Sequence, residues 1–184
     1  MYQSWSGSTP LLYEDLRFPA QATNPPGAES DPSRNSTTGL LEFAGNADNI
    51  IVGIAQLPHT WKKGSTLHPH LHLNFPTSAA KNTRWQFGYN IADMDGAFAA
   101  GDIGNWTSLD AVTVTNPQDT DKHVYADLGN IPMTGYLVSC CIHWKVARLA
   151  SSDGDDDDTN ACALLEFDIH YQLDSEGSRT ELVK

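Results

Sequence analysis

Apolar and polar residues alternate along most of the chain from Thr37 onward, in short segments separated by glycine, proline, asparagine and aspartate. Alternation with a period of two is typical of strands that have one buried face and one wetter face. The segment 84–92 shows it clearly, because aromatic and aliphatic residues occupy every second position. The same pattern predicts strands at 38–44, 50–56, 67–75, 84–92, 109–115, 123–128, 136–149 and 161–173.

About eight short strands with turn residues between them are typical of an all-β sandwich or barrel. We predict a jelly-roll-like antiparallel β-sandwich over residues 37–184, with an immunoglobulin-like sandwich as the alternative. A short helix over 50–61 is a further alternative, which Gly53 and Pro58 disfavour. The last two strands are predicted to pair as a hairpin around a loop at 150–160.

Residues 1–36 differ from the rest of the chain because they are rich in proline, glycine and serine. Proline fixes φ and removes a backbone donor, which favours an extended chain. A disordered tail rarely holds many large apolar side chains. The segment is therefore predicted to be an extended arm that docks on its own body or on a neighbouring subunit, the alternative being a loose terminus. Its expected anchors are Trp5, Leu11, Leu12, Tyr13, Leu16 and Phe18.

The length of 184 residues fits one domain with an arm, and the formal net charge of −12 narrows the possible partners. Nucleic-acid affinity comes largely from lysine and arginine on phosphates, so neither nucleic acid nor an anionic membrane surface is an expected partner. The polar segment from Met1 to Pro10 carries no basic residue, so no secretory signal is expected there. Three cysteines without a C-x-x-C spacing are interpreted as small hydrophobic residues.

Histidines supply the strongest candidate chemistry. His68, His70 and His72 share one face of a predicted strand, while His143 and His170 lie on the polar faces of the last two strands, the latter beside Glu166 and Asp168. If these faces met inside a barrel, they would form a metal site of a cupin-like enzyme. The alternative is a polar sheet face or a subunit interface, and Pro69 indicates an edge or a bulge there. We favour this alternative and predict no metal, no cofactor and no catalytic residue.

Other candidate motifs are weaker. The acidic run 153–158 lacks the spacing of an EF-hand loop and is interpreted as a solvated loop. The chain contains neither a G-x-S-x-G motif nor a P-loop. Trp61 and Trp106 could form a platform for a sugar ring, whereas Trp85 and Trp144 are in phase with apolar neighbours and are predicted to lie in the core.

Three blocks of the chain form a recognisable set: 56–65 continuing into 68–72, 84–89, and the closing block 164–179. Together they resemble a family of small virion proteins of tailed bacteriophages. The resemblance implies a structural component of a phage particle that is made in the host cytoplasm. The Asp-rich run departs from the family pattern in length and charge.

Within such a particle, a small acidic sandwich with an apolar arm suits a capsid decoration, or cement, protein. Its expected partners are the major capsid protein on the outer shell surface and further copies of itself, as a homotrimer. An arm must compensate an ordering cost of about 1–2 kcal/mol per fixed residue, which its aromatic anchors would do. The alternative location is the tail, in a fibre or baseplate component that attaches to host glycan.

Overall fold

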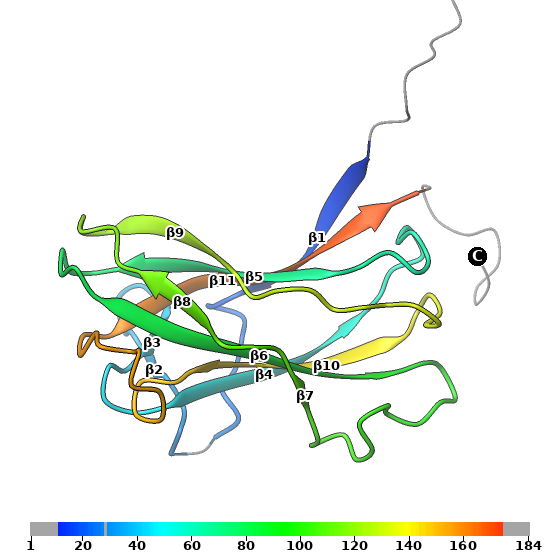
Figure 1. The fold of residues 1–184 in the computed structure, drawn as a ribbon, viewed down its shortest axis with the longest axis horizontal. Coiled ribbons are helices and arrows are strands. Elements are labelled where there is room, and N and C mark those ends of the chain that lie inside the picture. Colours follow the sequence, from blue (N-terminus) through cyan, green and yellow to red (C-terminus); the bar gives the residue numbers. More distant parts are fainter. Residues whose placement is uncertain (1–10, 28, 175–184) are drawn as a thin grey trace, which may run out of the picture.

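The computed structural model describes residues 11–27 and 29–174, and in these residues the chain forms eleven strands and no helix (Figure 1). The described residues therefore contain no helix that is long and apolar enough to cross a membrane. The strands pair antiparallel in two sheets that pack face to face. The protein is an all-β, jelly-roll-like antiparallel β-sandwich, and the predicted fold class is confirmed.

The first sheet is built around the long strand β11 (Cys162–Leu173). One side of β11 pairs with β5 (His68–Phe75), which in turn pairs with β9 (Lys122–Asp127). The other side pairs first with β3 (Leu41–Phe43), itself joined to β2 (Ser33–Arg34), and then with β1 (Leu12–Pro19). Strands β1 and β2 both come from the segment that the sequence predicts as an arm.

The second sheet is built around β10 (Cys141–Arg148). This strand lies between β4 (Asn49–Gln56) and β6 (Asn82–Ala92), and β6 also pairs with β7 (Thr107–Ser108) and β8 (Val112–Thr115). Each of the eight predicted strand segments overlaps one observed strand, so these predictions are confirmed. The alternative helix at 50–61 is wrong, because most of that segment is β4.

The predicted hairpin between the last two strands is wrong. Strand β10 is central in the second sheet and β11 is central in the first, so the loop 150–160 crosses from one sheet to the other. Each strand has a strongly apolar face, and the two faces cover each other across the sandwich. The Trp144 and Phe167 rings lie 4.6 Å apart at this crossing.

Aromatic side chains hold the two sheets together. Phe167 of the first sheet contacts Trp144 and Phe87 of the second, and Phe18 of β1 packs against Trp144 at 5.0 Å and beside Phe167 at 5.5 Å. Trp85 and Trp144 are fully buried, as the sequence predicts. Such contacts are worth about 0.5–1.5 kcal/mol each beyond the area that they bury.

A β-bulge between Leu164 and Glu166 changes which side chains of β11 face the core. Strict alternation would place Ala163, Leu165 and Phe167 on one face. Because the bulge inserts one extra residue, Leu164 and Phe167 both face inward and are 0% exposed. The outward positions that follow the bulge are Glu166, Asp168 and His170.

The cysteines behave as small buried residues, as predicted. Cys140 and Cys162 are buried, Cys141 is half-buried, and all three are free. Burial raises the pKa of Cys140 to about 12, with a further contribution from the Asp93 carboxylate. Burial also raises the pKa of Cys162. The thiolate is the reactive form, so neither of these two thiols is suited to nucleophilic chemistry.

Candidate functional site

The outer face of the first sheet gathers most of the polar side chains that the sequence singles out. Four neighbouring strands, β1, β11, β5 and β9, contribute alternate residues to it. We call this surface the histidine face. Its members are Tyr13, Asp15 and Arg17 of β1, Glu166, Asp168 and His170 of β11, His68, His70 and His72 of β5, and His123, Tyr125 and Asp127 of β9.

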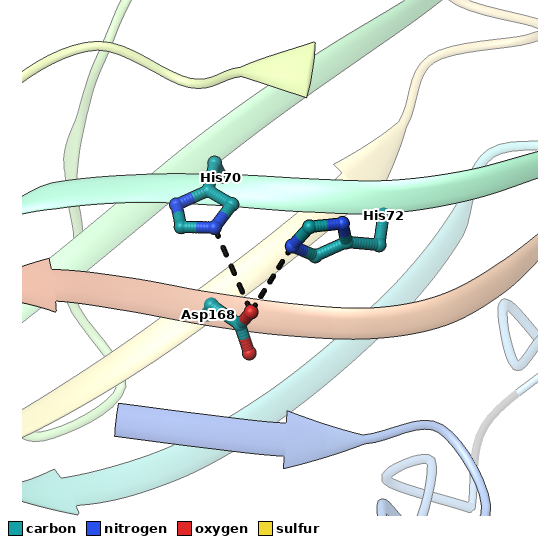
Figure 2. Close-up of side chains that lie close together, drawn as sticks. All are labelled: His70, His72 and Asp168. Atoms are coloured by element: carbon teal, nitrogen blue, oxygen red, sulfur yellow. Dashed lines mark ion pairs between the residues drawn. The ribbon is translucent and has the colours of Figure 1, made fainter. Parts of the chain in front are cut away.

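At the centre of this face two imidazoles converge on one carboxylate (Figure 2). The Nε2 atom of His70 lies 3.6 Å from Oδ2 of Asp168, and Nε2 of His72 lies 3.1 Å from the same oxygen. Asp168 is 3% exposed and His70 is 5% exposed, although they lie on the outer side of the sheet. Tyr125 and His72 cover His70, with ring centroids 5.0 Å from its own.

The pKa values of the two imidazoles shift in opposite directions. Burial by itself lowers the pKa of His70, but the Asp168 carboxylate outweighs burial and raises this pKa above its ordinary value. For His72 burial prevails, with repulsion from His70 and His123, and its pKa is lowered despite the attraction of Asp168. Perturbed pKa values cluster at functional sites, so this pair of imidazoles marks a candidate site.

The remaining candidate histidines have different surroundings. His68 donates from Nδ1 to Oδ1 of Asn130 at 2.7 Å. His170 donates from Nδ1 to Oδ1 of Asp15 at 2.6 Å, and its ring stacks on Tyr13. His143 belongs to β10 of the other sheet, where it bonds to the Ile103 carbonyl. The less favoured alternative, a gathering of histidines inside a barrel, is therefore wrong: His68, His70, His72 and His170 share an outer sheet face, and His143 lies on the other sheet.

The arm anchors divide into two groups. Leu16 and Phe18 pack against the hydrophobic core of their own chain. Leu11, Leu12 and Tyr13 are 63%, 58% and 41% exposed. Trp5 lies outside the described residues. Figure 1 shows β1 and the end of β11 rising side by side from one end of the sandwich, and we call this pair of strands the terminal ribbon.

Two hollows border the histidine face. One, of about 460 Å³, is lined by Asp15, Arg17, His72, His123, Leu165, Glu166 and Asp168. Arg17 crosses its margin in a two-point ion pair with Glu166, at 2.6 and 2.8 Å. The other, of about 800 Å³, lies at the base of the terminal ribbon and includes Tyr13, Lys62, Lys63, His68 and Gln172.

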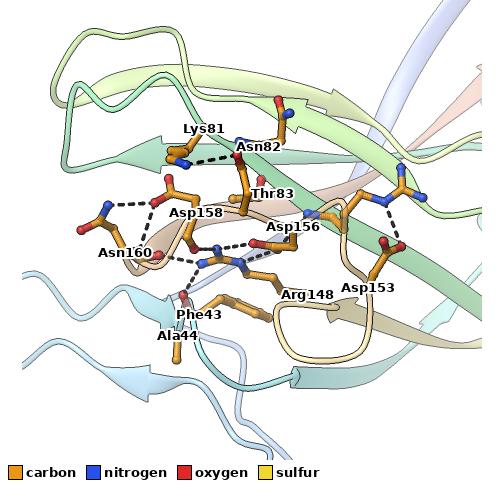
Figure 3. Close-up of polar contacts among 12 residues, drawn as sticks. Phe43, Ala44, Lys81, Asn82, Thr83, Arg148, Asp153, Asp156, Asp158 and Asn160 are labelled. Atoms are coloured by element: carbon orange, nitrogen blue, oxygen red, sulfur yellow. Dashed lines mark hydrogen bonds and ion pairs between the residues drawn. The ribbon is translucent and has the colours of Figure 1, made fainter.

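The acidic run 153–158 is not the solvated loop that the sequence predicts. Figure 3 shows it folded around Arg148, whose side chain and that of Asp156 are both 0% exposed. Arg148 donates two bonds to Asp156 and three more to the carbonyls of Phe43, Asp158 and Asn160. All five of its N–H donors are thus used.

Three further carboxylates of the run, those of Asp153, Asp157 and Asp158, also have partners. Asp153 accepts from Nε of Arg84 at 3.0 Å, and Asp157 accepts from Nζ of Lys81 at 3.2 Å. The chain passes so close to Gly45 that a Cβ there would lie 2.2 Å from the Thr159 carbonyl carbon. The run therefore acts as a structural clamp, and its geometry is not that of a calcium loop.

The tryptophan platform that the sequence offered as a possibility is not formed. Trp61 is 0% exposed, and Trp106 is covered by His143 and Lys145 on the second sheet. The most exposed aromatic ring of the histidine face is instead Tyr125, at 58%. The sequence analysis missed Tyr125 and His123, and their alternate positions along the short strand at 123–128 are the signal that could have placed them on one face.

Comparison with known proteins gives no family for this chain. No protein-family model matches it, and no curated protein matches it. Among solved structures, a family 35 carbohydrate binding module from an environmental isolate covers 92% of this chain and 99% of its own, with 10% identity and a TM-score of 0.48. The CBM22-1 xylan-binding domain from Paenibacillus barcinonensis Xyn10C covers 87% and 94%, with 14% identity and a TM-score of 0.37.

A third similar structure is the enzymatically active domain of tailspike protein 4 from bacteriophage CBA120. The match covers 88% of this chain but only 19% of the tailspike chain, with 7% identity and a TM-score of 0.36. Similarities of this size identify no function, so the function is argued from the residues themselves.

Proposed function

We propose that this protein is a non-enzymatic structural component of a tailed-phage virion and that it decorates the outer surface of the capsid. The resemblance of blocks 56–72, 84–89 and 164–179 to small phage virion proteins supports the proposal. So does the net charge of −12, which suits an outer surface better than contact with packed DNA. The protein acts as a homotrimer that seats on the major capsid protein.

The observation that carries the proposal is the terminal ribbon. Its exposed side chains Leu11, Leu12 and Tyr13 are adjacent in sequence, so they offer apolar surface on both faces of the ribbon. Lys62 and Lys63 lie at its base, beside Tyr13. Apolar anchors next to a localised positive charge form a contact surface of the kind that concentrates binding energy in a few residues.

Substitutions on the ribbon test this contact. Leu12→Asp combined with Tyr13→Asp is expected to weaken binding to purified shells about tenfold or more, because each anchor would be replaced by a charge. Cosedimentation with shells measures the binding. Ile54→Asp is the matched control, since Ile54 is 56% exposed on a strand of the other sheet.

Equal binding of the ribbon variant and the control would refute this contact. Counting the copies in an imaged particle locates the protein independently. A copy number that follows the shell subunits supports the head, and one that follows the tail symmetry contradicts it. Sedimentation equilibrium of the purified protein tests the trimer.

A glycan-attachment function is the second candidate, and Tyr125 is the observation that favours it. This exposed ring stands on the histidine face beside His70 and His72, and the hollow next to it holds Asp15, Arg17, His123 and Glu166. Aromatic stacking combined with charged hydrogen-bonding groups suits a sugar ring. A glycan array is expected to show a signal that Tyr125→Ala removes and Ile54→Asp keeps. An array without any signal would exclude this function.

A further inference from the structure

At the centre of the histidine face, a neutral His70 ring places an acceptor nitrogen opposite the acceptor oxygens of Asp168. Nδ1 of His70 lies 3.3 Å from the His68 carbonyl oxygen, which only accepts, so Nδ1 carries the proton. In the neutral ring Nε2 is then an acceptor, and it faces the Asp168 carboxylate at 3.6 Å. Two acceptors cannot face each other at a buried position unless a proton or a metal ion lies between them.

The Asp168 carboxylate also needs a positive charge beside it. Its Oδ1 atom is buried and has no hydrogen-bond partner among the described residues. The nearest basic side chain on the face, Arg17, is already paired with Glu166, and the other close carboxylate is Asp15. A carboxylate that is 3% exposed and has one oxygen without a partner is costly unless a cation compensates it.

The nitrogen–oxygen spacings of this group match those around a small divalent ion. One ligand atom from each of His70, His72 and Asp168 can be chosen so that all lie within 4.8 Å of one another. Zinc binds imidazole nitrogen at about 2.0–2.1 Å, which makes the edge of a coordination tetrahedron about 3.4 Å. The two nitrogen–oxygen distances of 3.1 and 3.6 Å bracket that edge.

Outer contacts hold both imidazoles in the orientation that a ligand needs. His70 is held through Nδ1 by the His68 carbonyl, and His72 is held through Nδ1 by Nε2 of His123 at 2.6 Å. Metal-ligating histidines almost always donate their second ring N–H to a carboxylate, a backbone carbonyl or water, and the contact of His70 with the His68 carbonyl is of this kind. The hollow of about 460 Å³ borders His72 and Asp168, so it leaves a fourth position open to water.

We propose that His70, His72 and Asp168 bind one divalent transition-metal ion of the zinc type, with the Nε2 atoms and a carboxylate oxygen as ligands. Two imidazoles and one carboxylate form a donor set suited to zinc, and cobalt(II) occupies the same sites. The ion would tie β5 to β11 across the centre of the first sheet. This role is structural and does not depend on the proposed function of the protein.

The test uses the full chain, purified without a histidine tag and stripped with a chelator. Titration with Co²⁺ is expected to give the visible absorption of a tetrahedral site with one equivalent bound, and Zn²⁺ is expected to displace it. His72→Gln should weaken binding about 100-fold or more, since it removes a ligand and its outer contact. His143→Gln, on the other sheet, should bind like the unmodified chain.

Nitrogen NMR of the unmodified protein provides a second measurement that needs no variant. Zn²⁺ is expected to shift the Nε2 signals of His70 and His72 and to leave those of His143 unchanged. The proposal is overturned if no equivalent of either ion binds, as would happen if a proton on His70 supplies the cation. It is also overturned if His72→Gln binds as tightly as His143→Gln.

Discussion

Replacing Arg148 by methionine is expected to lower the free energy of unfolding by about 3–5 kcal/mol. The change leaves Asp156 buried without its counter-charge and removes the donors of the Phe43, Asp158 and Asn160 carbonyls. Urea denaturation followed by circular dichroism measures the loss. Adding Asp156→Asn to this variant should recover part of it, because the uncompensated charge is then removed.

Lys81→Met is the matched control for this prediction. Lys81 pairs with Asp157 of the same acidic run, but both side chains are 47% exposed. Exposed ion pairs contribute about 0–1 kcal/mol, so the control should change stability by no more than that. Similar losses in the two variants would show that Arg148 does not organise the loop.

Phe18→Ala is expected to lower the free energy of unfolding by about 3 kcal/mol, the low end for removing a packed aromatic ring. Phe18 is half-buried and touches Trp144 and Phe167, so its loss removes aromatic packing where the two sheets meet. Thermal and urea unfolding measure the effect. A loss below about 1 kcal/mol would contradict the packing described for β1.

Leu12→Ala is the control on the same strand. Leu12 is 58% exposed, and exposed substitutions usually change stability by less than about 0.5 kcal/mol. The pair of variants separates the two tasks of β1. Its second half closes the core, whereas its first half is available for contact with a partner.

The alternation of apolar residues was enough to predict the sandwich and its long strands, because each strand has one face in a common core. It could not predict the bulge beside Leu165, since one extra residue leaves the composition of a strand unchanged. It also missed β1, where Pro19 and many exposed residues hide the pairing with β11. Long-range pairing decides both features.

The histidine face and the acidic run differ in how much of them the sequence reveals. His68, His70 and His72 were found because one strand carries them all, but their convergence on Asp168 depends on the pairing of β5 with β11. The sequence does contain a signal from which the clamp on Arg148 could be predicted. Arg148 follows Trp144 and Val146 in the inward phase of its strand, and a buried arginine needs an acidic partner.

The pairing of β1 with β11 also determines how the sandwich would respond to mechanical load. Leu12 lies opposite Leu173 and Pro19 lies opposite Glu166, so the outer ends of the two strands lie together at one pole. Antiparallel hydrogen bonds run perpendicular to the strands. Tension applied between Leu12 and Leu173 would therefore peel the strands apart one bond at a time, rather than slide them past each other, and the aromatic cluster around Phe18 would be the last part to yield.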